Sequence, residues 1–107
     1  MKLYMLAIIA FSLGAIAGVE AATVTVVQRG QVFDRASAAV AHGDRMVFTN
    51  EDDVIHNIHV FGPGDDQKDL GVQKPGATLS YTFDKAGTFT IRCNIHPSMR
   101  MTVYPCE

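Results

Sequence analysis

The chain has 107 residues, of which 48% are hydrophobic and 19% charged, and its formal net charge is −2 at pH 7. This length accommodates one domain. The Lys and Arg residues are scattered and form no basic stripe, which argues against a nucleic-acid-binding function.

The N-terminal segment reads as a targeting sequence. Residues 3–18 are almost wholly apolar and follow a single Lys2, and Ala21 ends a small-residue pattern of the kind that signal peptidases cleave. We predict a secretory signal peptide at 1–21, the alternative being an uncleaved membrane anchor. No other stretch is apolar enough to span a membrane. The mature domain, 22–107, is then expected in the periplasm or secreted, without a membrane span.

Beyond the signal, short alternating runs are separated by Gly, Pro, Asn and Asp, and no helical period or internal repeat appears. This pattern is typical of an all-β fold. Residues 62–76 form the longest irregular stretch, which we predict to be a solvated loop, with a partner-docking patch as the alternative. The expected strands are 23–29, 36–41, 45–49, 56–61, 77–83, 88–93 and 99–104.

Alternation along these strands indicates which side chains face the core. Successive residues of a strand point to opposite faces, and the apolar face of each strand is the one expected to be buried. Cys93 shares a face with Phe89 and Ile91, and His56 shares one with Ile58 and Val60. By the same test Met99 and Met101 point inward, whereas Asn57 and His59 point outward. We expect His59 to be a surface histidine and not part of a second metal site.

Three residues near the C-terminus carry metal-binding chemistry. Cys93, His96 and Met99 place a thiolate, an imidazole and a thioether within seven positions. His56, 37 positions before Cys93, supplies a second imidazole. Soft sulfur with borderline nitrogen selects copper, and a His₂Cys trigonal set with a weak axial Met is the blue-copper arrangement. The pattern therefore predicts one copper ion held by these four residues, with His96 in a loop between strands.

The segments that carry this pattern resemble a known family. They are H-N-I-H at 56–59, G-T-F at 87–89 before Cys93, and H-P-S-M-R at 96–100. Together they are similar to the cupredoxins, the small blue-copper proteins, and most of all to amicyanin-like members, with plastocyanin and pseudoazurin as wider relatives. The resemblance covers roughly 24–104. It departs from the family at Ile95, where such loops usually carry Pro, and at Cys106, which has no counterpart.

The resemblance implies a Greek-key β-sandwich with one type 1 copper. It also implies that His56, Cys93, His96 and Met99 are the ligands. Asn57 is then expected to support the Cys93 sulfur through its backbone N–H and to tie the two ligand loops together through its side chain. Contacts of this kind orient ligands and tune the metal.

Met101 and Cys106 lie close to the ligand segment in sequence and also carry sulfur. Met101 faces the same way as Met99, but the two residues between His96 and Met99 match the short amicyanin-like loop, so we assign the axial position to Met99 and core packing to Met101. Cys106 lies far along the last strand, about 20 Å from Cys93 at 3.3 Å per residue, which is outside disulfide reach. An unpaired cysteine of this kind predicts a covalent dimer through Cys106.

These features predict an electron-transfer protein that cycles Cu(II) and Cu(I) between redox partners docking transiently near His96. We do not expect an enzyme, because no nucleophile–base pair is present and four protein ligands leave no open position for a substrate. The alternative is a copper chaperone or sequestering protein without an electron-transfer role. It would use the same ligands, so the residues alone do not separate the two functions.

Overall fold

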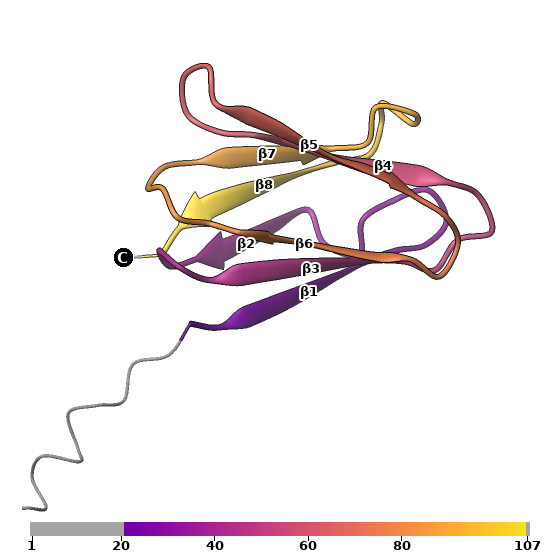
Figure 1. Ribbon diagram of the computed structural model, residues 1–107, viewed down its shortest axis with the longest axis horizontal. Coiled ribbons are helices and arrows are strands. Elements are labelled where there is room, and N and C mark those ends of the chain that lie inside the picture. The colour runs from indigo at the N-terminus through magenta and orange to yellow at the C-terminus, as the bar shows by residue number, and fades with distance from the viewer. Residues whose placement is uncertain (1–20, 107) are drawn as a thin grey trace, which may run out of the picture.

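A computed structural model describes residues 21–106, and two β-sheets packed face to face account for all their regular structure (Figure 1). The predicted all-β sandwich is thereby confirmed. The predicted signal peptide, apart from its last residue, lies outside the described residues. Within residues 21–106, no helix is long and apolar enough to cross a membrane.

Eight strands are present in residues 21–106, and seven of them correspond to predicted strands with ends shifted by at most one residue. They are β1 (Thr23–Gln28), β2 (Ser37–Val40), β3 (Arg45–Asn50), β4 (His56–Phe61), β5 (Gln67–Gln73), β6 (Thr78–Thr82), β7 (Phe89–Arg92) and β8 (Arg100–Pro105). The prediction of a loop throughout 62–76 was wrong, because β5 lies within that range. β5 is a mostly polar edge strand that pairs only with β4, so its sequence lacks the apolar alternation of a core strand.

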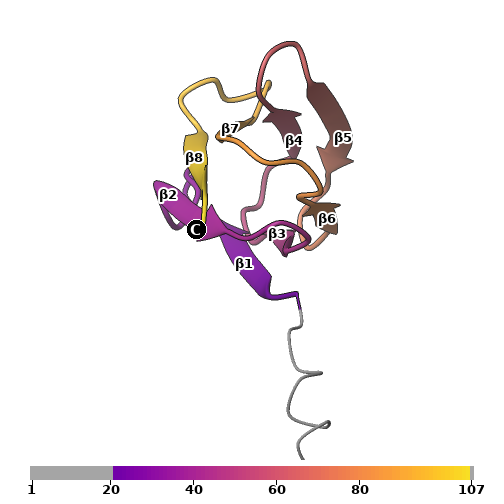
Figure 2. The same cartoon turned by 90° about the vertical axis from the view of Figure 1, so that its left-hand side faces the viewer.

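The strand order brings the ends of the central strands together. One sheet has the order β1-β3-β6 and the other β2-β8-β7-β4-β5, and the two layers are seen end-on in Figure 2. β7 lies between β4 and β8 and is antiparallel to both. The end of β7 is therefore next to the beginnings of β4 and β8, at one end of the sandwich.

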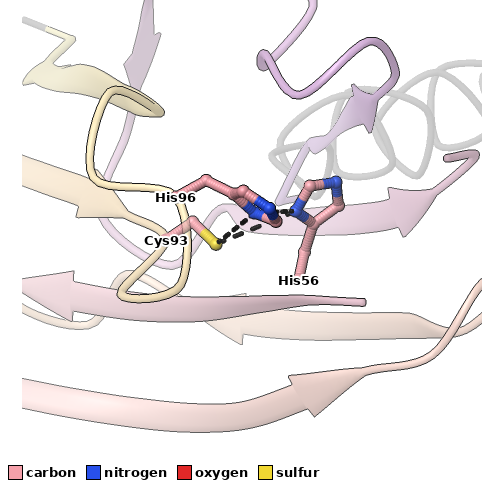
Figure 3. A group of neighbouring side chains, drawn as sticks. All are labelled: His56, Cys93 and His96. Atoms are coloured by element: carbon pink, nitrogen blue, oxygen red, sulfur yellow. Dashed lines mark hydrogen bonds between the residues drawn. The ribbon is translucent and has the colours of Figure 1, made fainter. Parts of the chain in front are cut away.

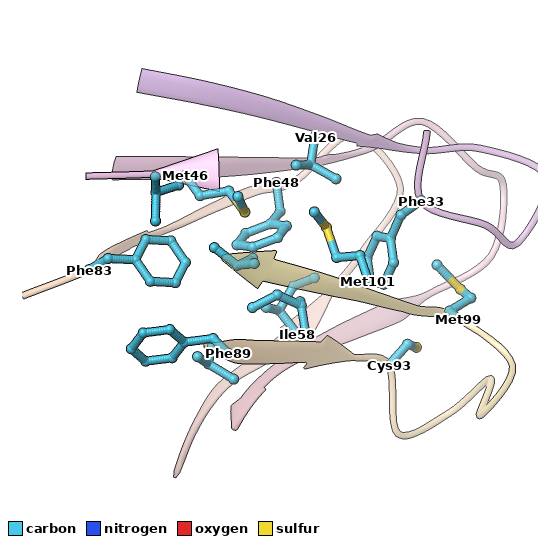
Figure 4. Packing of buried hydrophobic residues seen from close by; sticks show 14 residues of the cluster. Val26, Phe33, Met46, Phe48, Ile58, Phe83, Phe89, Cys93, Met99 and Met101 are labelled. Atoms are coloured by element: carbon cyan, nitrogen blue, oxygen red, sulfur yellow. The ribbon is translucent and has the colours of Figure 1, made fainter. Parts of the chain in front are cut away.

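A single hydrophobic core fills the space between the sheets (Figure 4). Phe83 and Phe89 meet in a T-shaped contact with ring centroids 5.0 Å apart, a geometry that aromatic pairs favour. At the opposite end of this core lie Cys93 and Met99, each 1% exposed. The core consists of Val26, Phe33, Val40, Met46, Phe48, Ile58, Val60, Phe83, Phe89, Ile91, Cys93, Met99, Met101 and Val103.

The inward directions predicted by alternation agree with the observed burial. His56 is fully buried, as are Ile58 and Val60 on the same face of β4. Asn57 points to the other face, yet it is only 4% exposed because its side chain bonds to β5 and to the loop after β7. Alternation gives the direction of a side chain but not what covers it.

Asp44 ties the turn before β3 to the N-terminal end of the domain. Its carboxylate accepts hydrogen bonds from the backbone N–H groups of Ala22, at 2.9 Å, and Ala41, at 2.8 Å. These bonds favour the charged form, so the pKa of Asp44 lies below its ordinary value. Its folded-state pKa is thus lower than its unfolded-state pKa. The stability that it contributes is present above about pH 4 and is lost as the pH falls through the folded-state pKa.

We expect Asp44→Asn to reduce the acid sensitivity of the domain. The wild-type free energy of unfolding should fall between neutral pH and pH 3, and the variant should lose less because it carries no carboxylate there. Denaturant unfolding of the metal-free protein at the two pH values measures this. Asp65, an exposed aspartate, offers a matched control through Asp65→Asn. A variant with an unchanged pH dependence would show that Asp44 does not carry the effect.

Candidate metal centre

Three predicted ligands converge at the end of the sandwich where β4 and β8 begin and β7 ends. His56 is the first residue of β4, Cys93 follows β7 directly, and His96 lies in the loop that leads to β8. Their side chains point toward one another (Figure 3), and one atom of each lies within 4.8 Å of the others. His56 and Cys93 are buried and His96 is half-buried, so the group is open to solvent only on the His96 side.

The three donor atoms form a triangle of a size that suits a metal ion. The Nδ1 atoms of His56 and His96 are 3.1 Å apart, and each lies 3.8 Å from the Cys93 Sγ atom. A point in the plane of this triangle lies about 2.1 Å from all three atoms, within the roughly 2.0–2.3 Å that zinc, a metal of similar size, makes to nitrogen and sulfur. The residues therefore fit a trigonal His₂Cys site.

The loop before β4 fixes the orientation of the His56 ring. The Nε2 atom of His56 lies 2.6 Å from Oδ2 of Asp52. An ionised carboxylate only accepts hydrogen bonds, so Nε2 carries the proton and the lone pair of Nδ1 points into the triangle. Ligating histidines usually make such a bond with their other nitrogen, and it raises their basicity.

Asp52 is itself held by the loop after β1. The N–H groups of Gly30 and Gln31 donate to its two carboxylate oxygens. Both residues have positive φ, 68° and 59°, which turns successive N–H groups toward the same anion. Burial raises the pKa of Asp52, but the hydrogen bonds from His56, Gln31 and Gly30 outweigh burial, and the pKa lies below its ordinary value. Asp52 therefore remains a carboxylate at neutral pH.

Asn57 connects the two segments that carry the candidate ligands. Its backbone N–H points at the Cys93 sulfur over 3.4 Å, and its side-chain Oδ1 accepts a hydrogen bond from the Asn94 N–H at 2.6 Å. An N–H donor stabilises negative charge on sulfur. The residue thus contacts the Cys93 sulfur and links β4 to the loop that follows β7.

Met99 closes the ligand loop on the core side. The Met99 N–H donates to the His96 carbonyl at 2.9 Å, and the Cys93 N–H donates to the Met99 carbonyl at 3.3 Å. In Figure 4 Met99 lies at the same end of the core as Cys93, whereas Met101 lies further toward the middle. The thioether of Met99 is therefore the one placed near the candidate metal site.

The comparisons with known proteins identify the family of the chain. Residues 20–104 match the model of a family described as copper binding proteins, plastocyanin/azurin family. The chain belongs to this family. The predictions of a cupredoxin and of a copper cofactor are thereby confirmed.

Two curated relatives of this cupredoxin are methylamine utilization proteins MauL. The protein from Methylophilus methylotrophus is 38% identical over 60 residues, which cover 54% of this chain and 34% of the relative. The protein from Methylorubrum extorquens (strain ATCC 14718 / DSM 1338 / JCM 2805 / NCIMB 9133 / AM1) is 34% identical over 59 residues, covering 55% and 52%. The matched segment thus spans only about a third to a half of these relatives.

Solved cupredoxin structures share the fold. A reduced Cu(I) form of an amicyanin variant is similar with a TM-score of 0.71 and 26% identity, covering 86% of this chain and 88% of that one. A second reduced amicyanin variant gives the same score and identity, covering 84% and 88%. A purple cupredoxin from Nitrosopumilus maritimus, at 16% identity and a TM-score of 0.67 over 78% and 99%, supports the fold alone.

Cys106 is exposed and Cys93 is buried, and neither forms a disulfide within residues 21–106; a dimer linked through Cys106 stays a prediction.

Sequence reasoning missed Asp52. The only signal for it was a carboxylate four residues before a predicted ligand, in a loop with three acidic residues in a row. Nothing in the sequence marks which of those three contacts the imidazole.

Proposed function

We propose that this chain is a type 1 copper electron-transfer protein, in which His56, Cys93 and His96 would supply the main donors and Met99 a weak fourth donor. The observation that carries the proposal is the triangle of donor atoms with a point about 2.1 Å from all three. Copper, when bound there, supplies a one-electron couple between Cu(II) and Cu(I). Four protein ligands leave no open position for a substrate, which supports a carrier over an enzyme.

The residues around the triangle keep its shape constant. His56 belongs to a central strand and is fixed through Asp52, while Cys93 is anchored through Asn57. Side chains held by packing and hydrogen bonds from rigid elements retain one geometry. A site of this kind changes little when the charge of the metal changes, so little energy is spent on rearrangement during electron transfer.

Addition of Cu(II) to the mature protein tests this function. We expect an intense visible thiolate-to-copper band at one equivalent and a reversible one-electron wave in voltammetry. A copper chaperone with the same ligands would instead hold Cu(I) that a chelator removes easily, and it would show no stable Cu(II) form. Absence of the band with wild-type protein would refute the electron-transfer assignment.

The surface around His96 supports transient docking of redox partners. Ile95, next to His96, is 41% exposed, and Ile55, next to His56, is 45% exposed. The neighbouring Pro97 and Ser98 are uncharged and exposed. A small, uncharged surface of this kind suits the small interfaces of short-lived redox complexes.

A negative charge beside His96 is expected to slow electron exchange without changing the copper site. In Ser98→Glu two molecules that meet through this surface would each present a carboxylate, and like charges oppose association. We expect self-exchange, measured by NMR line broadening, to slow several-fold at low ionic strength and to recover as salt screens the charges. An unchanged self-exchange rate with an intact visible spectrum would show that electrons do not pass through the surface around His96.

Export to the periplasm is proposed from the N-terminal sequence. Cleavage after Ala21 would leave Ala22 as the first residue, and its nitrogen lies 2.9 Å from the Asp44 carboxylate. A free α-amino group there would form an ion pair with Asp44. We expect the intact mass of protein recovered from the periplasm to begin at Ala22; a mass that includes residues 1–21 would contradict processing at this site.

A further inference from the structure

Two hydrogen-bonded relays connect the edge strand β5 to the loop that carries the candidate ligands. One runs from Asp69 through Asn57 to the backbone of Asn94, and the other runs from Gln67 through His59 to the side chain of Asn94. Both relays end on the residue that directly follows the candidate thiolate. Neither Asp69 nor Gln67 belongs to a ligand segment.

The first relay fixes the orientation of the Asn57 amide. One oxygen of Asp69 accepts hydrogen bonds from the Asn57 Nδ2 group at 2.8 Å and from the Gly71 N–H at 2.9 Å. Because a carboxylate only accepts, it holds the amide nitrogen of Asn57 on its side. The amide oxygen must then face Asn94, whose N–H it binds at 2.6 Å. A reversed Asn57 amide would place its NH₂ group against the Asn94 N–H, so that two hydrogen-bond donors would face each other.

A β-bulge shapes this part of the edge strand. The register between β4 and β5 shifts so that Asp69 and Gly71 both have partners and Leu70 has none. Gly71 has a φ of 107°, a backbone conformation that residues other than glycine rarely adopt. Bulges redirect side chains and are common beside functional sites. Here the bulge places the Gly71 N–H on the same Asp69 oxygen that holds Asn57.

The second relay uses the histidine that was expected to be a simple surface residue. The Asn94 Nδ2 group lies 2.8 Å from Nδ1 of His59, and His59 Nε2 lies 2.9 Å from Oε1 of Gln67. An amide NH₂ group only donates, so Nδ1 accepts and Nε2 carries the proton that is donated to Gln67. The His59 ring also stacks on Phe61 with centroids 4.1 Å apart, which restricts its rotation.

We propose, on the basis of the copper site proposed above, that Asp69 and Gln67 of β5 are positioning residues for the thiolate ligand. They act through Asn57 and His59 to hold Asn94 at two points. Asn94 shares a peptide bond with Cys93, so a displaced Asn94 moves the Cys93 sulfur relative to the N–H of Asn57. The edge strand thereby sets the hydrogen bonding of the ligand without touching it.

The first relay is tested by comparing Asp69→Ala with Asp69→Asn. The alanine variant removes the acceptor, whereas asparagine keeps an oxygen that accepts both bonds. We expect Asp69→Ala to lower copper affinity by 10–100-fold, the range for contacts behind metal ligands, and to shift the visible band. Asp69→Asn should restore both. Asp65→Ala removes an exposed charge from the same β4–β5 connection and should leave both unchanged.

Hydrogen exchange of the metal-free protein provides a readout independent of copper. We expect the Asn94 backbone amide to exchange at least tenfold faster in Asp69→Ala, while amides in the middle of β8 keep their wild-type rates. His59→Phe keeps a ring to stack on Phe61 but removes both bonds of the second relay. The copper affinity of His59→Phe should fall and its visible band should shift. This variant tests the second relay even if Asp69→Ala fails to fold.

Two outcomes would overturn these roles. Wild-type copper affinity and spectrum in both Asp69→Ala and His59→Phe would show that the relays serve only local packing, as would an unchanged exchange rate at Asn94. A wild-type protein that forms no intense visible band would instead refute the proposed function. In that case accelerated exchange at Asn94 in the metal-free variant would still support the relay itself.

Discussion

Replacing Cys93 with serine is expected to abolish the visible absorption of the copper-loaded protein completely. A coordinated cysteine binds as a thiolate, and the proposed band depends on charge transfer from that sulfur. Serine leaves the two imidazole donors of His56 and His96, 3.1 Å apart, but removes the soft donor that selects copper. The variant should bind Cu(II) weakly, without colour, and lose the reversible voltammetric wave. Absorption and paramagnetic resonance spectra during copper titration measure this.

Cys106→Ser is the matched control because it makes the same chemical change at the other cysteine. Cys106 is exposed and follows β8, at the end of the domain remote from the candidate site. The visible band should therefore be identical to that of the wild type. Loss of colour in Cys106→Ser, or its retention in Cys93→Ser, would show that the ligand assignment is wrong.

The direction of the buried candidate ligands could be predicted from sequence because alternation in a strand is a local property. His56 lies on the apolar face of its strand and Cys93 on that of the predicted strand 88–93, and they are 0% and 1% exposed. Met99 lies just before β8 on the same face as Met101 and Val103, and it is also 1% exposed. The spacing Cys-x-x-His-x-x-Met then predicted the donor set, since a loop of this length returns the chain to the same edge.

The residues that support the ligands could not be predicted in the same way. Asp52, Asp69 and Gln67 act through side-chain contacts that depend on register and loop shape. The β-bulge that places Asp69 requires knowledge that β5 exists, and its polar sequence gives no alternation to reveal it. Even for Asn57, whose role the family resemblance implied, alternation gave only an outward direction, because its cover comes from these same segments.

Met99→Leu is expected to retain copper and colour but to raise the reduction potential. The proposed axial contact is weak, so the three equatorial donors keep the metal without it. Cu(II) favours a fourth donor more than Cu(I), which is stable with three ligands, and removal of this contact therefore favours the reduced state. A tenfold change in the ratio of the two affinities corresponds to about 59 mV for one electron, and we expect a rise on the order of that size in voltammetry.

Met101→Leu separates an axial role from a packing role. Met101 is 2% exposed within the core, and exchanging Met for Leu nearly conserves volume, which usually costs less than about 1.5 kcal/mol. Its reduction potential should match the wild type, while the free energy of unfolding falls slightly. Met99 and Met101 are two residues apart on the same strand face, and both variants replace Met with Leu. A difference between the two variants therefore reports the position of the thioether and not the type of substitution. A raised potential in Met101→Leu with none in Met99→Leu would move the axial ligand one pleat further along β8.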